Sequence, residues 1–167
     1  TGELRRSVLD IRLTMVAPGR GDGSLRRTLL LARELGVGAA VDLTGGVGKA
    51  EVPECLARGD IFLNTSRADN TPVSVMEAMA CGLAIVTTDV GGVPYLLEHE
   101  RDALLTTSEN VAGFVAAVRR LLDDAALFRT LTRNAREKVA SFDWGVVLPQ
   151  WGELFSTAPL RGPRWAS

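Results

Sequence analysis

Short apolar runs alternate with helix-like segments up to residue 105, and this alternation constrains the fold more than any other feature. The runs are Ile11–Val16, Val41–Leu43, Ile61–Asn64, Ala84–Thr87 and Ala103–Leu105. They show little alternation of apolar and polar residues, which is typical of strands buried on both faces. Strands that alternate with helices pair in parallel, so we predict an α/β, Rossmann-like parallel sheet with helices on both faces.

The segments between the runs carry helix start and stop signals. Helices are predicted at Ser24–Leu35, Val52–Arg58 and Val73–Cys81, with a short one after Pro94. Ser24 is expected to be the N-cap of the first, and Gly82 to end the third. Apolar residues at helical spacing predict two further helices, from Val111 and from Leu127. The segment 142–155 is predicted to be a helix that breaks near Pro149, and residues 156–167 to be an irregular tail.

Composition excludes several classes of function. A length of 167 residues suggests one domain, and a net charge of −1 gives no electrostatic case for binding nucleic acid. No apolar stretch has the length of a membrane span and no signal peptide is visible, so we expect a cytoplasmic location. Cys55 and Cys81 are expected to be buried free thiols, and His99 a solvated turn residue. We expect neither a metal nor a cofactor.

The loops that follow the strands are where an open parallel sheet binds ligands. Three of the four loops are rich in glycine, and the glycines expected to approach a ligand are Gly19, Gly45, Gly46, Gly91 and Gly92. Two of the loops lead directly into helices, whose free N–H groups favour an anion. Each glycine could equally serve a tight turn, but four such loops on one rim favour a nucleotide or phosphate site.

The stretch "SRADNTPVSVMEAMACGLAIVTTDVGGVP", residues 66–94, carries a more specific signal. Asp69 is followed after seven residues by Glu77 and "AMACG", and then by an apolar run and a glycine pair. This stretch resembles the donor-binding, C-terminal domain of the retaining glycosyltransferases of family 4, which have the GT-B fold. The resemblance extends from about residue 11 to residue 155.

The resemblance implies a role for each matching residue. Glu77 would accept hydrogen bonds from the ribose hydroxyls of a nucleotide-sugar. Asp69, Asn70 and Thr71 would face the donor sugar, with Asp69 as the catalytic residue. Val73 and Ser74 would offer their backbone N–H groups to the diphosphate.

Three departures from the family pattern concern the sugar. Asp69 replaces the usual glutamate, so its side chain is about one methylene shorter. "NTPVS" replaces a common "GFGL" pattern, and its Pro72 has no N–H to offer. Tyr95 stands where many members have a glutamate.

The resemblance also implies parts that the chain does not contain. The family has an N-terminal domain that binds the acceptor, and its donor domain opens with a strand, an arginine and a lysine that neutralise the leaving diphosphate. We therefore expect residues 1–155 to be an incomplete donor-binding domain, inactive alone, with that acceptor domain of the same parent chain as its partner. Any peripheral membrane association would be through the missing domain. With the first strand absent, Val41–Leu43 should pair with Ile11–Val16, and the other three strands should form a separate group.

The function implied is transfer of a hexose from a nucleotide-diphosphate sugar to an acceptor, with retention of configuration, in the biosynthesis of a polysaccharide. One alternative is a non-catalytic Rossmann-like module that binds a nucleotide-sugar or a partner. A GT-B epimerase is a third, but the further acids and histidines it would want are not found.

Overall fold

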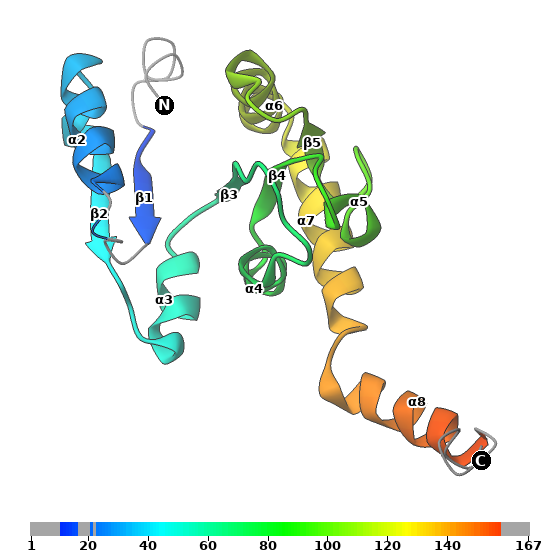
Figure 1. Ribbon diagram of the computed structural model, residues 1–167. Coiled ribbons are helices and arrows are strands. Elements are labelled where there is room, and N and C mark those ends of the chain that lie inside the picture. The colour runs from blue at the N-terminus through cyan, green and yellow to red at the C-terminus, as the bar shows by residue number, and fades with distance from the viewer. Residues whose placement is uncertain (1–10, 17–20, 22, 158–167) are drawn as a thin grey trace, which may run out of the picture.

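The computed structural model describes residues 11–16, 21 and 23–157 (Figure 1). Its strands are β1 (Leu13–Val16), β2 (Val41–Gly45), β3 (Ile61–Asn64), β4 (Ala84–Thr88) and β5 (Leu104–Thr106). Its helices are α2 (Ser24–Glu34), α3 (Val52–Leu56), α4 (Val73–Cys81), α5 (Val93–Leu96), α6 (Val111–Asp123), α7 (Ala125–Ala140) and α8 (Trp144–Thr157). Two short 3-10 helices, Gly38–Ala40 and Lys49–Glu51, precede β2 and α3.

The strands form two parallel sheets. In the first, β1 pairs with β2, with Leu13 opposite Val41. In the second, the order is β3-β4-β5, with Ile61 opposite Ala84 and Val86 opposite Leu104. These neighbours confirm the predicted grouping of the five strands. Within the described residues no ladder joins β1 to β3, and a further strand between them stays a prediction.

The core lies on both faces of β4, whose five residues are all buried. Ile85 packs on one side with Met79 of α4 and Val93 of α5. Val86 packs on the other side with Leu121 of α6 and Leu131 of α7. The prediction of helices on both faces is therefore confirmed for the sheet that contains β4.

The first sheet differs from the expectation of strands buried on both faces. Along β1 and β2 the residues alternate between half-buried and exposed. Figure 1 shows α2 beside these two strands, and within the described residues this is the helix that accompanies them. A two-stranded sheet covered in this way can bury only alternate side chains.

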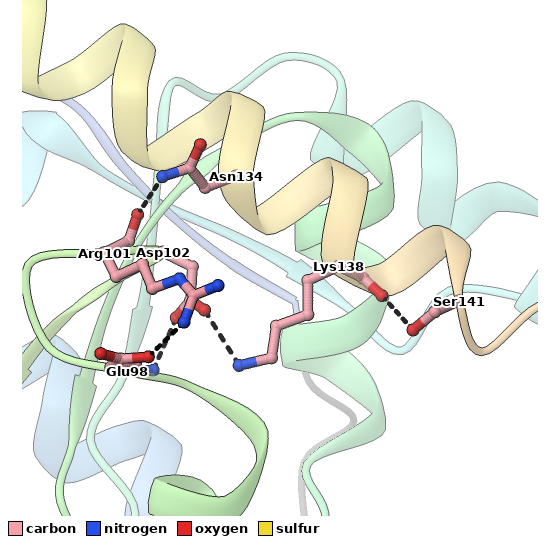
Figure 2. A network of polar contacts seen from close by, with 6 residues as sticks. All are labelled: Glu98, Arg101, Asp102, Asn134, Lys138 and Ser141. Carbon is pink, nitrogen blue, oxygen red and sulfur yellow. Dashed lines mark hydrogen bonds and ion pairs between the residues drawn. The ribbon is translucent and has the colours of Figure 1, made fainter.

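A polar network ties the loop between α5 and β5 to α7 (Figure 2). The side chain of Asp102 is 3% exposed, and its carboxylate accepts hydrogen bonds from the backbone N–H of Glu98 at 2.7 Å and from Lys138 Nζ at 2.9 Å. Asn134 Nδ2 donates to the carbonyl oxygen of Arg101 at 2.7 Å. Because α7 also packs against β4, these contacts fix the loop to the core.

Helix ends and the last helix depart from expectation at several points. The N-cap of α2 is Gly23, with φ +76°, and Ser24 is the first helical residue. α8 continues through Pro149, which removes one intrahelical hydrogen bond; the helix is exposed along its length, so water can solvate the freed carbonyl. α8 also includes residues 156 and 157, and the rest of the expected tail lies outside the described residues.

The two cysteines and the last helix, α8, are not fully buried. Cys55 and Cys81 are free thiols as expected, but they are half-buried. Figure 1 shows α8 projecting away from both sheets, and Trp151 stacks on Phe155 along it with ring centroids 5.5 Å apart. No helix in the part of the chain that the structure describes combines the length and apolar character needed to cross a bilayer.

Candidate functional site

The loop between β3 and α4, residues 65–72, is held in place by the end of β4 and the turn after it. Thr88 Oγ1 donates to the carbonyl oxygen of Ser66 at 2.6 Å. The N–H of Gly92 donates to the carbonyl oxygen of Asp69 at 2.9 Å. Within the loop, the single hydroxyl proton of Ser66 is shared between two acceptors, Asn64 Oδ1 at 2.8 Å and Asp69 Oδ2 at 3.3 Å. The carboxylate of Asp69 is thus anchored by a side chain and its backbone by a neighbouring turn.

An open hollow of about 550 Å³ lies over this loop. Its lining residues are Arg67, Ala68, Asp69, Asn70, Gly91, Gly92 and Tyr95. Four of them, Asp69, Asn70 and the glycine pair, are predicted site residues that the structure brings together. Tyr95 is 91% exposed and flanks the hollow, so its ring is available to a ligand rather than to the core.

The start of α4 supplies unpaired backbone donors. Pro72 is the N-cap residue, and its carbonyl accepts the N–H groups of Val75 and Met76. The N–H groups of Val73 and Ser74 have no partner among the described residues, and the first turn holds no acidic residue. Such a helix start is suited to an anion because of its free donors and its positive dipole end.

Glu77 lies one turn further along α4. Its neighbours Val75, Ala78 and Met79 are fully buried, whereas Glu77 itself is half-buried. Its carboxylate makes no hydrogen bond or ion pair with any residue that the structure describes. A half-buried carboxylate with all its acceptor capacity free is well prepared for a ligand with two hydroxyl groups.

The predicted site residues do not all line the hollow. Four predicted residues that come shortly after Asn70 in the sequence are not among its lining residues: Thr71, Val73, Ser74 and Glu77. Gly45 and Gly46 lie at the end of β2, in the other sheet, and are not part of the hollow either. Gly19 lies outside the described residues. The structure thus brings Asp69 and Asn70, two of the three residues predicted to face the sugar, together with the glycine pair, and the role of every site residue stays a prediction.

Sequence reasoning missed how the glycine pair is used. A side chain on Gly91 would overlap the carbonyl oxygen of Asp69, and one on Gly92 would overlap the carbonyl oxygen of Asn70. The sequence predicts that the pair lets a ligand approach, which stays a prediction; the pair lines the hollow, and the structure shows that it also lets the loop of residues 65–72 approach. The glycines alone signal a close approach, but no local pattern names the group that approaches.

Sequence reasoning also missed an ion pair beside the hollow. Arg67 Nη2 lies 2.8 Å from Glu109 Oε1, which joins the loop after β3 to the loop after β5. Both side chains are largely exposed, so the pair contributes little to stability. Within the described residues no cluster of three or more His, Cys, Asp or Glu side chains is arranged to hold a metal ion.

Comparison with known proteins places the chain in a family. Residues 2–124 match the family described as "Glycosyl transferases group 1". The chain belongs to the glycosyl transferases group 1 family. The matched range includes the loop of residues 65–72, α4 and the glycine pair.

Curated relatives of this group 1 chain are longer than it is. Sulfoquinovosyl transferase SQD2 of Arabidopsis thaliana is 28% identical over 149 residues, which are 85% of this chain and 28% of that protein. Glycogen synthase of Mycobacterium tuberculosis is 30% identical over 163 residues, which are 96% of this chain and 38% of that protein. The chain therefore spans well under half the length of these relatives.

Solved structures show the same fold. Anabaena HepE in complex with UDP superposes with a TM-score of 0.84 and 23% identity over 93% of this chain and 43% of that chain. HepE in complex with UDP-glucose gives a TM-score of 0.81 with 24% identity, again over 93% of this chain and 43% of that chain. The fold is that of the C-terminal domain of GT-B glycosyltransferases.

Proposed function

We propose that this chain is the donor-binding domain of a retaining, metal-independent glycosyltransferase of family 4. It would bind a nucleotide-diphosphate hexose, and the protein that contains it would transfer the hexose to an acceptor. The observation that carries this proposal is the partnerless, half-buried carboxylate of Glu77, one turn after the unpaired N–H groups of Val73 and Ser74. The solved complexes of HepE with UDP and UDP-glucose support it through their shared fold.

Each group is proposed to take one part of the donor. Glu77 accepts hydrogen bonds from the two ribose hydroxyls, which suits a carboxylate because it has two acceptor oxygens. The start of α4 meets the diphosphate with the N–H groups of Val73 and Ser74. Asp69, Asn70 and Thr71 face the hexose, since Asp69 and Asn70 line the hollow.

The proposed reaction exchanges one bond at the anomeric carbon. The bond to the diphosphate oxygen breaks, a bond to the acceptor oxygen forms on the same face, and the acceptor proton leaves with the diphosphate. Positive charge develops on the sugar as the leaving group departs, and the carboxylate of Asp69 stabilises this charge. Cationic groups that neutralise the leaving diphosphate, and an N-terminal domain that binds the acceptor, are proposed to lie outside this chain, which alone would be inactive. A growing polysaccharide or a lipid-linked sugar is the proposed class of acceptor.

The experiment is a calorimetric titration of the full-length protein that carries this sequence. UDP, GDP and ADP are titrated in turn to find the nucleotide, and the measurement is repeated with Glu77→Gln. Loss of a charged hydrogen bond costs about 1.5–3 kcal/mol, so affinity should fall roughly ten- to a hundredfold. Glu137→Gln is the matched control, because Glu137 is an exposed carboxylate on α7.

Two results would contradict the proposal. The role of Glu77 is excluded if Glu77→Gln binds the preferred nucleotide as tightly as the wild type. Retention is excluded if NMR of the first-formed product shows the anomeric configuration opposite to that of the donor. Tight nucleotide binding without transfer to any acceptor would instead favour a non-catalytic binding module.

A further inference from the structure

We propose that the Gly91–Gly92 turn and Thr88 are positioning residues, which set the place of Asp69 and Asn70 against the donor sugar. This inference rests on the proposed function, because it assumes that these two residues face the sugar. It assigns the glycine pair, which also lines the hollow, a role that acts through the loop of residues 65–72.

Contact between the turn and the loop is made by backbone on both sides. The N–H of Gly92 donates to the carbonyl oxygen of Asp69 at 2.9 Å. A methyl group on Gly91 would overlap that same carbonyl, and one on Gly92 would overlap the carbonyl of Asn70. Side chains can relieve an overlap by changing rotamer, but backbone atoms cannot. Any larger residue in the turn must therefore displace the loop or the turn itself.

The turn is the more rigid of the two partners. It follows β4, which is buried along its whole length, and leads into α5, where Val93 is 0% exposed and Leu96 is 6% exposed. The N–H of Asp89, at the start of the turn, donates to the carbonyl oxygen of Thr106 in β5 at 2.8 Å. With core residues on both sides and a bond to β5, the turn is expected to stay in place while the exposed loop moves.

Thr88, the last residue of β4, forms a second link to the loop of residues 65–72. It is 1% exposed, and its hydroxyl donates to the carbonyl oxygen of Ser66 at 2.6 Å. Ser66 Oγ in turn lies 3.3 Å from Asp69 Oδ2. The position of the Asp69 carboxylate therefore depends on two contacts: Gly92 holds the backbone carbonyl of Asp69, and Thr88 holds Ser66, whose hydroxyl lies beside the carboxylate.

The nucleotide end of the site does not depend on the turn in this way. Glu77 belongs to α4, which is fixed by Val75, Ala78 and Met79 in the core. Displacement of the loop should leave Glu77 in place and move only the groups that face the sugar. This separation predicts a selective defect: weaker recognition of the sugar and slower transfer, with nucleotide binding retained.

The test uses the full-length protein with Gly92→Ala and Thr88→Val. Thr88→Val keeps the side-chain shape and removes the hydrogen bond, so it serves if Gly92→Ala fails to fold. Gly59→Ala is the matched control, because an added methyl there would meet only ordinary contacts, at 3.5 Å from Leu56 and Leu83. Hydrogen exchange of the 65–72 peptides should be faster in both site variants than in the wild type or the control.

The second readout is functional. Affinity for the nucleoside diphosphate should stay within about twofold of the wild type, while kcat should fall on the order of a hundredfold, the effect of about 1 Å of misplacement. The extra affinity that the hexose adds over the nucleoside diphosphate should also be lost. Rescue is expected from Thr88→Ser, which restores the hydroxyl.

Each outcome decides between the alternatives. Unchanged exchange of the 65–72 peptides in both variants would overturn the inference, and so would a parallel loss of nucleotide affinity and kcat. A wild-type protein that binds no nucleoside diphosphate would refute the proposed function. In that event the exchange measurement would still decide whether the turn positions the loop.

Discussion

Substitution of Lys138 by methionine tests how much the polar network in Figure 2 contributes to local stability. The Asp102 carboxylate is 3% exposed, and among the residues that the structure describes the change leaves it with one hydrogen-bond donor, the N–H of Glu98. Removing one partner of a buried ion pair costs about 3–5 kcal/mol. The Lys138 side chain is 33% exposed, so water can replace part of the interaction. We therefore expect a cost of about 2–3 kcal/mol, below the fully buried range.

The assay is hydrogen exchange of the full-length protein, because it reports the opening of single segments. A cost of this size should raise the opening of residues 97–103 roughly 30- to 150-fold. The double variant Asp102→Asn/Lys138→Met removes the unpaired charge while an amide oxygen can still accept from Glu98. Its exchange should return most of the way to that of the wild type.

Two results would refute this reasoning. Wild-type exchange in Lys138→Met would mean that the ion pair is not needed to hold the loop. Exchange in the double variant as fast as in Lys138→Met would mean that the lost contact from Lys138 Nζ, rather than an unpaired buried charge on Asp102, opens the loop.

Two further predictions concern the core and the response to acid. Leu131→Ala should lower the free energy of unfolding by about 2–5 kcal/mol, because Leu131 is 0% exposed and packs against β4. Leu122→Ala is the control and should cost far less, because Leu122 is exposed; denaturant unfolding of both variants measures the difference. The hydrogen bond from Arg120, at 2.7 Å, lowers the pKa of Glu100 in the folded state. The contribution of this pair to folding stability is therefore present above the ordinary glutamate pKa of about 4.3, and it is lost as the pH falls through the lower pKa of the folded state. The wild type should therefore lose stability more steeply than Arg120→Gln in acid denaturation below this pH, and equal slopes would contradict the assignment.

Local signals in the sequence were sufficient to predict most of the helices and strands. Gly82 was expected to end α4, and it does so with φ +82°, because only a residue without a side chain adopts that conformation easily. The β–α alternation predicted that the strands pair in parallel, and the resemblance to the family, with its first strand absent, predicted which strands are neighbours. Two predictions were wrong. Ser24 is not the N-cap of α2, because Gly23 turns the chain into the helix one residue earlier. Pro149 does not break α8, because the helix is exposed there and water can replace the lost hydrogen bond.

Long-range contacts could not be predicted in the same way. Thr88 and Ser66 are 22 residues apart, and nothing in the spacing of either residue indicates the hydrogen bond between them. A glycine pair after a strand indicates that another group approaches the backbone closely. Whether a ligand or the chain itself approaches depends on where another loop runs, and that depends on the packing of the whole sheet.

The shorter acid at position 69 makes this long-range contact more important. The family pattern that the chain resembles has a glutamate there, whose extra methylene adds a rotatable bond with which the carboxylate can adjust. Asp69 has less freedom of this kind, so the position of its carboxylate follows its backbone more closely. That backbone is fixed by the N–H of Gly92. Under the proposed function, Asp69→Glu should therefore make transfer by the full-length protein less sensitive to Gly92→Ala, because the longer side chain can recover part of the lost reach.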